Sequence, residues 1–191
     1  MDAGQKGGGT HKKRIVIDEH RVRLQANGLD GRIEIGNSYN NDQLDTIKAD
    51  YLIANPPFND GSKGENGWGA DKIVKKDPRL NIGDTYLPLS PRNANTMWIL
   101  HFLYHLKPTG TAGFVMATGE LSNSETARLE VRKTLVENDY VDCIVQLTGQ
   151  LFANTQIPCC LWFLSKNRDG KNGFRKEKAK SFLLTAENLG R

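Results

Sequence analysis

The sequence predicts an α/β fold with a mainly parallel sheet and helices on both of its faces, which makes three layers. The main observation is that short apolar runs alternate with segments whose apolar residues recur at helical spacing. Strands and helices that alternate in this way form parallel sheets, because each helix carries the chain back to begin a neighbouring strand. A second observation is the length: 191 residues suffice for one sizeable core, so we predict one domain.

The elements are predicted in chain order. Residues 1–13 are glycine-rich and lack apolar periodicity, so we expect a flexible tail or an expression remnant there and the folded domain at 14–191. A strand is expected at 15–17, then a helix at 19–27 that Gly28 closes. The last two strands lack a helical pattern between them, which favours an antiparallel pair at a sheet edge. Further strands are expected at 32–36, 50–54, 111–117, 140–147, 157–164 and 181–184, and helices at 95–106 and 122–137.

The composition excludes some classes of protein. Charged residues make up 25% and hydrophobic residues 38% of the chain, as in ordinary globular proteins. No apolar run could span a bilayer and no secretory signal is present, so we expect a cytoplasmic protein without a membrane partner. The net charge of +4 permits a DNA partner without requiring one. The odd number of cysteines, without a C-x-x-C pair, favours reduced core thiols over a zinc site: Cys143, Cys159 and Cys160.

One motif carries chemistry. The apolar run 50–54 ends at Asn55-Pro56-Pro57-Phe58, and ligands of open α/β sheets bind beyond the carboxyl ends of strands. The prolines fix φ, and a proline after Asn55 keeps that residue extended, so the turn is stiff. The Asn55 side-chain oxygen and the Pro56 carbonyl then form two adjacent acceptors, which suit the two hydrogens of an exocyclic amino group.

This stiff turn, Asn55-Pro56-Pro57-Phe58, is called the N-P-P-F corner below. Its two acceptors suit methyl transfer to adenine. The adenine amine is a poor nucleophile because its lone pair is delocalised into the ring. Two acceptors draw the nitrogen toward tetrahedral geometry and direct the lone pair at an incoming methyl, without a strong base. Phe58 offers a face for stacking on a base that has flipped out of the duplex. The alternative is a purely structural turn with Phe58 buried, and the strand before it favours function.

The sequence resembles the modification subunits of type I restriction-modification systems, which are DNA adenine-N6 methyltransferases. This resemblance implies a Rossmann-like, S-adenosylmethionine-dependent methyltransferase domain, with Asn55 and Pro56 on the target amine and Phe58 on the base. It also places Asn37 where the family, often with Asp, contacts the cofactor adenine, and Asn is a weaker partner there. The resemblance covers residues 23–190 and rests on the N-P-P-F motif, NTMWILH (95–101), GTAGFVMATG (110–119), GQLF (149–152), TQIP (155–158) and FLLTAENLG (182–190).

The sequence departs from this family on its N-terminal side. The family's cofactor site rests on a strand followed by a glycine-rich turn, whereas no apolar strand precedes the glycines at 4–9. We therefore expect an N-terminally truncated fold, a partial catalytic domain at 14–191 that lacks the main cofactor-binding loop. Alone, this chain should bind S-adenosylmethionine weakly or not at all.

The resemblance also implies partners and leaves alternatives. It implies DNA, a specificity subunit and a restriction subunit as partners, and the recognition sequence would be set by the specificity subunit. One alternative is a stand-alone adenine or glutamine methyltransferase, although the glutamine enzymes usually carry Tyr in place of Phe58. Another alternative is an inactive remnant that binds only protein or DNA.

Three further features of the sequence are candidates for binding roles. The long segment 59–93, with Trp68, Asp77-Pro78-Arg79 and Tyr86, could close over a target base or contact DNA. His101 and His105 have a metal-compatible i, i+4 spacing, but no third ligand is evident, so no metal site is predicted. Basic residues at 11–14, 21–23 and 166–180 could bind phosphates, although a solvated surface is the simpler interpretation.

Overall fold

The computed structural model describes residues 28, 31–34, 36–61, 68–69, 73, 76–148, 157–168 and 182–185. The chain divides into two compact units, Met1–Gly36 and Asn37–Arg191. The tail, the strand expected at 15–17 and the helix expected at 19–27 lie outside the described residues. Gly28 has φ +67°, in the left-handed region that favours glycine.

The strand expected at 32–36 is wrong for its described residues, because 31–34 and Gly36 have no regular secondary structure. The side chains of Arg32 and Glu34 do meet, with Arg32 Nε 2.8 Å from Glu34 Oε1. Alternation of side chains is satisfied by any extended segment, whereas a strand also requires a hydrogen-bonded neighbour. The alternating pattern at 32–36 was therefore not sufficient to predict a hydrogen-bonded strand.

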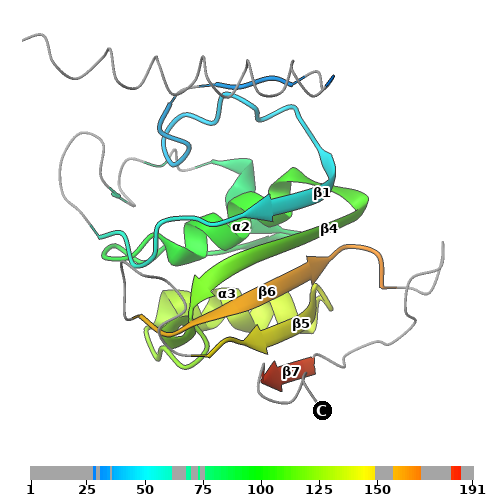
Figure 1. Ribbon diagram of the computed structural model, residues 1–191. Coiled ribbons are helices and arrows are strands. Elements are labelled where there is room, and N and C mark those ends of the chain that lie inside the picture. The colour runs from blue at the N-terminus through cyan, green and yellow to red at the C-terminus, as the bar shows by residue number, and fades with distance from the viewer. Residues whose placement is uncertain are drawn as a thin grey trace, which may run out of the picture. The chain divides into compact units, whose positions relative to one another are not determined.

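The larger unit is built on a five-stranded sheet in the order β1-β4-β6-β5-β7 (Figure 1). β1 is parallel to β4, β5 is parallel to β7, and β6 is antiparallel to both β4 and β5. Four of the five strands therefore run in one direction, which confirms a mainly parallel sheet. Their bounds are β1 Ala49–Ala54, β4 Leu106–Ala117, β5 Val141–Gln146, β6 Cys159–Ser165 and β7 Phe182–Thr185.

The expected antiparallel pairing of the last two strands is wrong. β6 lies inside the sheet between β4 and β5, and β7 lies at the edge, parallel to β5. The sequence of β6, CCLWFLS, is a nearly continuous apolar run, which is typical of an interior strand and not of an edge strand. The missing helical pattern after β6 correctly indicated that β6 and β7 run in opposite directions. It did not indicate that β6 pairs with β4 and β5 and that β7 pairs with β5.

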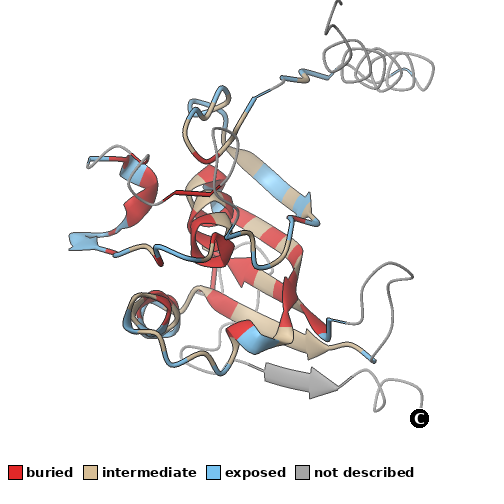
Figure 2. Ribbon diagram, turned by 90° about the vertical axis from the view of Figure 1, so that its left-hand side faces the viewer, coloured by how far each residue is buried: buried red, intermediate tan, exposed pale blue. Residues whose placement is uncertain are grey.

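Two α-helices, α2 (Asn95–His105) and α3 (Thr126–Glu137), cover the same face of the sheet (Figures 1 and 2). Phe114 of β4 lies opposite Trp162 of β6, and its ring centroid is 4.9 Å from that of Phe102 on α2. The described residues thus show two of the three expected layers. On β1, at the sheet edge, Tyr51 and Ile53 are 77% and 93% exposed. None of the described helices combines the length and apolar character that a membrane span requires.

β4 begins at Leu106, five residues before the strand predicted there. The helix does end before Pro108, but the chain becomes extended at once. The register with β1 jumps from Ala49↔Leu106 to Tyr51↔Thr111, so residues 107–110 form an irregular stretch. A proline is tolerated in such a stretch because no ladder hydrogen bond is needed from it.

α3 begins at Thr126, four residues after its predicted start. The 3₁₀ helix η3 (Thr118–Glu120) occupies the chain just before it. Asn123 then forms a local turn, because its Oδ1 accepts a hydrogen bond from the Glu125 N–H at 2.9 Å. Side chains that bond their own backbone compete with the first helical turn, which helical spacing alone does not reveal.

The segment 59–93 contains more structure than expected. It includes the 3₁₀ helix η2 (Pro78–Leu80) and a hairpin of β2 (Asn81–Ile82) and β3 (Thr85–Tyr86), with Gly83 at φ +58° in the turn. Trp68 is 4% exposed, and its Nε1 donates to the Ser90 carbonyl at 2.9 Å. The Trp68 ring is therefore part of the core, whereas Tyr86 is 55% exposed, and the hypothesis that this segment closes over a base or contacts DNA stays a prediction.

Candidate active site

The N-P-P-F corner follows the carboxyl end of β1. The strand places Ala54 beside Phe114 of β4, and the chain then leaves the sheet at Asn55. Asn55 is exposed, Pro56 is buried and Phe58 is half-buried. Among the described residues, no hydrogen bond occupies the Asn55 side chain. A buried proline thus supports an exposed amide, as a binding corner requires.

The residue after the corner has an unusual backbone. Asn59 has φ +53°, in the left-handed region, where Asn is one of the few non-glycine residues found. Its N–H donates to Asn95 Oδ1 at 2.8 Å, and its Oδ1 accepts from Asn95 Nδ2 at 3.0 Å and from Asn93 Nδ2 at 3.1 Å. The first turn of α2 therefore holds the exit from the corner.

The next two residues lie against the chain that leads into α2. The Ala94 N–H donates to the Asp60 carbonyl at 2.9 Å. At Gly61 the approach is so close that a Cβ would lie 2.3 Å from the Arg92 carbonyl oxygen, so only glycine fits there. These contacts fix where the chain goes after Phe58.

A buried carboxylate stands behind these contacts. Glu120, from η3, is 0% exposed and accepts from Asn95 Nδ2 at 3.1 Å. Arg128 of α3 pairs with Glu120 through both Nε and Nη2, and Arg132 Nη1 lies 3.7 Å from Glu120 Oε1. A buried carboxylate is tolerated only with such compensation. The corner is thus connected to α3 through side chains alone.

The residue expected at the cofactor lies in a turn that is tied to the same region. Asn37 is half-buried, and its Oδ1 accepts from the Tyr39 N–H at 3.0 Å. The Tyr39 hydroxyl donates to Asp60 Oδ2 at 3.1 Å and accepts from Trp98 Nε1 at 2.9 Å. Burial, and then the charge of Asp60, raise the pKa of Tyr39 above its usual value, so the phenol stays a donor. Tyr39 therefore links the Asn37 turn to the chain after Phe58.

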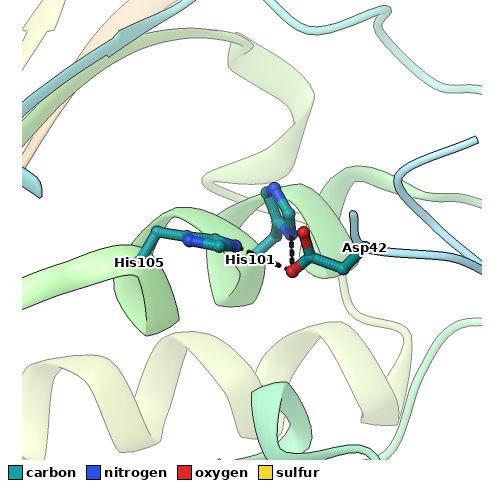
Figure 3. A group of neighbouring side chains, drawn as sticks. All are labelled: Asp42, His101 and His105. Atoms are coloured by element: carbon teal, nitrogen blue, oxygen red, sulfur yellow. Dashed lines mark hydrogen bonds and ion pairs between the residues drawn. The ribbon is translucent and has the colours of Figure 1, made fainter. Parts of the chain in front are cut away.

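The two histidines of α2 do have a carboxylate beside them. His105 Nε2 lies 2.8 Å and His101 Nδ1 3.7 Å from Asp42 Oδ2 (Figure 3). The interpretation that they lack a third ligand is thus wrong. However, Arg79 Nη1 lies 3.2 Å from His101 Nδ1, and His105 Nδ1 lies 2.8 Å from the Ile47 carbonyl. A neighbouring guanidinium opposes a second cation, so we interpret the cluster as a polar latch between α2 and residues 42–47.

This latch makes a pH dependence of stability predictable. Burial, and then the charge of His105, lower the pKa of His101 to about 4, and Arg79 adds to this effect while Asp42 and Asp77 oppose it. Because the folded pKa lies below the unfolded value of 6.5, the unfolded chain binds more protons between these values. Stability from this group is complete above pH 6.5 and is lost as the pH falls toward 4, by about 3 kcal/mol.

Urea unfolding at pH 7 and at pH 4.5 measures this loss. In the variant His101→Asn, the amide oxygen can still accept from Arg79 but does not titrate, so its stability should fall less over this range. Burial raises the pKa of Asp42, but the hydrogen bond and charge of His105, the Leu44 N–H and the charge of His101 together lower it below its usual value. The contribution of Asp42 is therefore lost only at a pH below the usual titration range of an aspartate. Equal acid losses in the wild type and in His101→Asn would contradict the prediction.

Sequence reasoning found the corner but missed the residues that hold it. The contiguous motif Asn55–Phe58 needed no fold to be recognised, and Asn37 came from the family resemblance. The missed residues are Tyr39, Asn59, Asn95 and Glu120. The only signals for them were an Asn-Ala-Asn sequence at the start of a helix and a carboxylate at the end of an apolar strand.

A mainly parallel α/β sheet with a proline-stiffened asparagine at a strand's carboxyl end defines a domain of the S-adenosylmethionine-dependent methyltransferase class. The comparison with known families identifies the particular one. The chain belongs to the N-6 DNA Methylase family, whose model matches residues 22–189.

Relatives of known type support this assignment. The chain is 40% identical over 181 residues to the type I restriction enzyme MjaIX methylase subunit of Methanocaldococcus jannaschii, covering 88% of this chain and 31% of the relative. It is 36% identical over 144 residues to the HindI methylase subunit of Haemophilus influenzae, covering 75% of this chain and 28% of the relative. The chain thus spans about a third of the length of these relatives.

A solved structure shows the same fold. The crystal structure of the type I restriction-modification methyltransferase subunit from Streptococcus thermophilus matches with a TM-score of 0.65 and 26% identity, over 78% of this chain and 31% of that one. The EcoKI M protein matches with a TM-score of 0.64 over 93% of this chain and 34% of that one, but at 16% identity it supports the fold alone.

Proposed function

We propose that this chain supplies the target-amine side of the active site of a DNA adenine-N6 methyltransferase, the methylase subunit of a type I restriction-modification system. The observation that carries the proposal is the exposed Asn55 amide, which is held at the end of β1 by a buried Pro56. An exposed amide without a role in packing, on a corner stiffened by two prolines, is available to a ligand.

In this function the corner binds and orients the adenine amine. Asn55 Oδ1 and the Pro56 carbonyl accept its two hydrogens, so that the nitrogen lone pair leaves the ring plane. Phe58 stacks on the flipped base and excludes water from one face of it. The transition state gains charge on this nitrogen, and two fixed acceptors stabilise that charge without reorganising.

The methyl donor in this proposal is S-adenosylmethionine, which supplies an electrophilic methyl group on sulfur. Of the described residues, Asn37 would contact the cofactor adenine. The Asn37 side chain is already used in part within its own turn, because its Oδ1 accepts from the Tyr39 N–H. Asn37 therefore fits the cofactor only in part, and no step of methyl transfer depends on it.

The relatives are named as methylase subunits of type I restriction enzymes. By this likeness we propose DNA, a specificity subunit and a restriction subunit as the partners of this chain. The specificity subunit would select the DNA sequence, and the corner would act on whichever adenine is presented to it.

The proposal is tested by identifying the methylated product. The complete natural polypeptide that carries this sequence is assembled with its partner subunits and incubated with DNA and methyl-labelled S-adenosylmethionine. Digestion to nucleosides should place the label in N6-methyladenine. Label in cytosine or in a protein glutamine would reject adenine as the target, and the absence of any transfer would favour an inactive remnant.

A further inference from the structure

The Asn95 side chain is fully buried, and its hydrogen bonds join Asn59, the residue after the N-P-P-F corner, to Glu120. It is 0% exposed, although a neutral amide at the start of a helix has no need to be buried. Its Oδ1 accepts from the Asn59 N–H, and its Nδ2 donates to Asn59 Oδ1 and to Glu120 Oε2. Both amide hydrogens and the oxygen are therefore used.

Glu120 determines which way this amide points. A carboxylate can only accept, so it must face Nδ2, and Oδ1 is then turned toward the Asn59 N–H. Rotation of Glu120 is opposed because Arg128 binds both of its oxygens in a site with 0% exposure, with the charge of Arg132 3.7 Å away. The orientation of Asn95 is thus set by a buried ion pair between Glu120 of η3 and Arg128 of α3.

Without its contacts to Asn95, Asn59 is the residue at which the backbone of the corner could change conformation. β1 fixes the chain on entry to the corner, and the two prolines restrict its middle, but after Phe58 the backbone turns into the left-handed region at φ +53°. Such a conformation persists only where neighbouring groups hold it, since it is strained for a side chain. The two bonds from Asn95 to Asn59, one to the main chain and one to the side chain, provide this hold.

We propose that Asn95, oriented by Glu120, is a positioning residue for methyl transfer: it locks Asn59 and thereby holds Asn55, Pro56 and Phe58 in the geometry that grips the target amine. This inference rests on the proposed function. A displacement of reacting groups by about 1 Å can cost on the order of 100-fold in rate, so loss of the contacts between Asn95 and Asn59 should lower kcat measurably.

The test exchanges the two buried groups in the assembled enzyme. Asn95→Asp places a second carboxylate against Glu120 and should lower kcat on the order of 100-fold, with little change in cofactor affinity. In the double variant Asn95→Asp with Glu120→Gln, one buried carboxylate remains. The amide introduced at position 120 can donate to the carboxylate introduced at position 95 and still accept from Arg128. That carboxylate can in turn accept from the Asn59 N–H. The double variant should recover at least about tenfold of the lost kcat over Asn95→Asp.

A matched control separates positioning from general stability. Arg168 is a buried arginine paired with Asp139 and lying near Asp142, at the start of β5. Arg168→Met should lower the melting temperature comparably while leaving kcat close to the wild-type value. If Asn95→Asp does not fold, Asn59→Gly replaces it: residue 59 is exposed, and glycine accepts φ +53° but loses the side-chain bonds, so kcat should fall about tenfold.

The outcomes separate this inference from the proposed function. A wild-type enzyme that does not methylate adenine removes the proposed function and the inference with it. A wild-type enzyme that does methylate adenine, together with an Asn95→Asp or Asn59→Gly variant whose kcat matches that of the Arg168→Met control, overturns the positioning role alone. Failure of the double variant to recover any activity would also overturn it, because orientation by Glu120 would then not be the cause.

Discussion

Replacing Asn55 by alanine should lower kcat for adenine methylation by about 1000-fold, with little change in stability or in cofactor affinity. The variant loses one of the two acceptors that draw the amine nitrogen toward tetrahedral geometry, and the loss of one fixed partner of a transition-state charge costs about that much. Stability should be preserved because Asn55 is exposed, and among the described residues no hydrogen bond occupies its side chain. Single-turnover rates with labelled cofactor measure the effect on the chemical step directly.

Two further variants make this result specific. Asn55→Asp keeps acceptor oxygens at the same position, so it should retain more activity than Asn55→Ala. Asn138→Ala removes another exposed asparagine, just after α3, where the chain leads to the amino end of β5 and so lies at the opposite end of the strands from the corner. Its kcat should match that of the wild type. A kcat for Asn55→Ala within tenfold of the wild-type value would contradict the proposal that Asn55 binds the target amine.

The parts of the fold that could be predicted are those set by local patterns. The apolar run at 50–54 and the helical spacing from Asn95 predicted β1 and α2 almost to the residue. The spacing in α2 reflects burial of the helix against the sheet, whereas β1 is an edge strand on which Tyr51 and Ile53 are 77% and 93% exposed. The place of β6 between β4 and β5 could not be predicted in the same way. Strand order depends on which faces meet in space, and a connection without a helix is compatible with several partners.

The residues of the candidate site also divide into those that a local pattern reveals and those that only the fold brings together. The N-P-P-F corner was visible because its chemistry lies in four consecutive residues. Its support was not, because Asn59, Asn95 and Glu120 are far apart in the sequence and meet only through the packing of α2 and α3 on one face. Asp42 likewise joins His101 and His105 only in the folded chain. Contiguous motifs can therefore be found from sequence, whereas the polar contacts that orient them require the structure.

Replacing Arg79 by methionine should destabilise the domain by about 3–5 kcal/mol, the usual result of breaking a buried ion pair from one side. The Arg79 side chain is 4% exposed, and its Nη2 lies 2.6 Å from Asp77 Oδ2, itself on a side chain that is only 10% exposed. Arg79 also donates to the Ser38 carbonyl at 2.6 Å and to the Tyr39 carbonyl at 2.7 Å. Methionine fills much of the volume, but it leaves the buried Asp77 carboxylate without its counter-charge and two carbonyls without their side-chain donor. Urea unfolding near pH 7, where His101 is neutral, measures the loss.

The matched experiment combines Arg79→Met with Asp77→Asn. Asparagine removes the charge that methionine leaves uncompensated, and its oxygen can still accept from the backbone N–H of residue 79, as Asp77 Oδ1 does at 2.9 Å. The double variant should therefore be more stable than Arg79→Met alone, although it carries one more substitution. If the two losses simply add, the uncompensated charge is not the cause of the destabilisation. The carbonyls of Ser38 and Tyr39 would then account for it, and Arg79 would act chiefly by fastening the Asn37 turn to the rest of the domain.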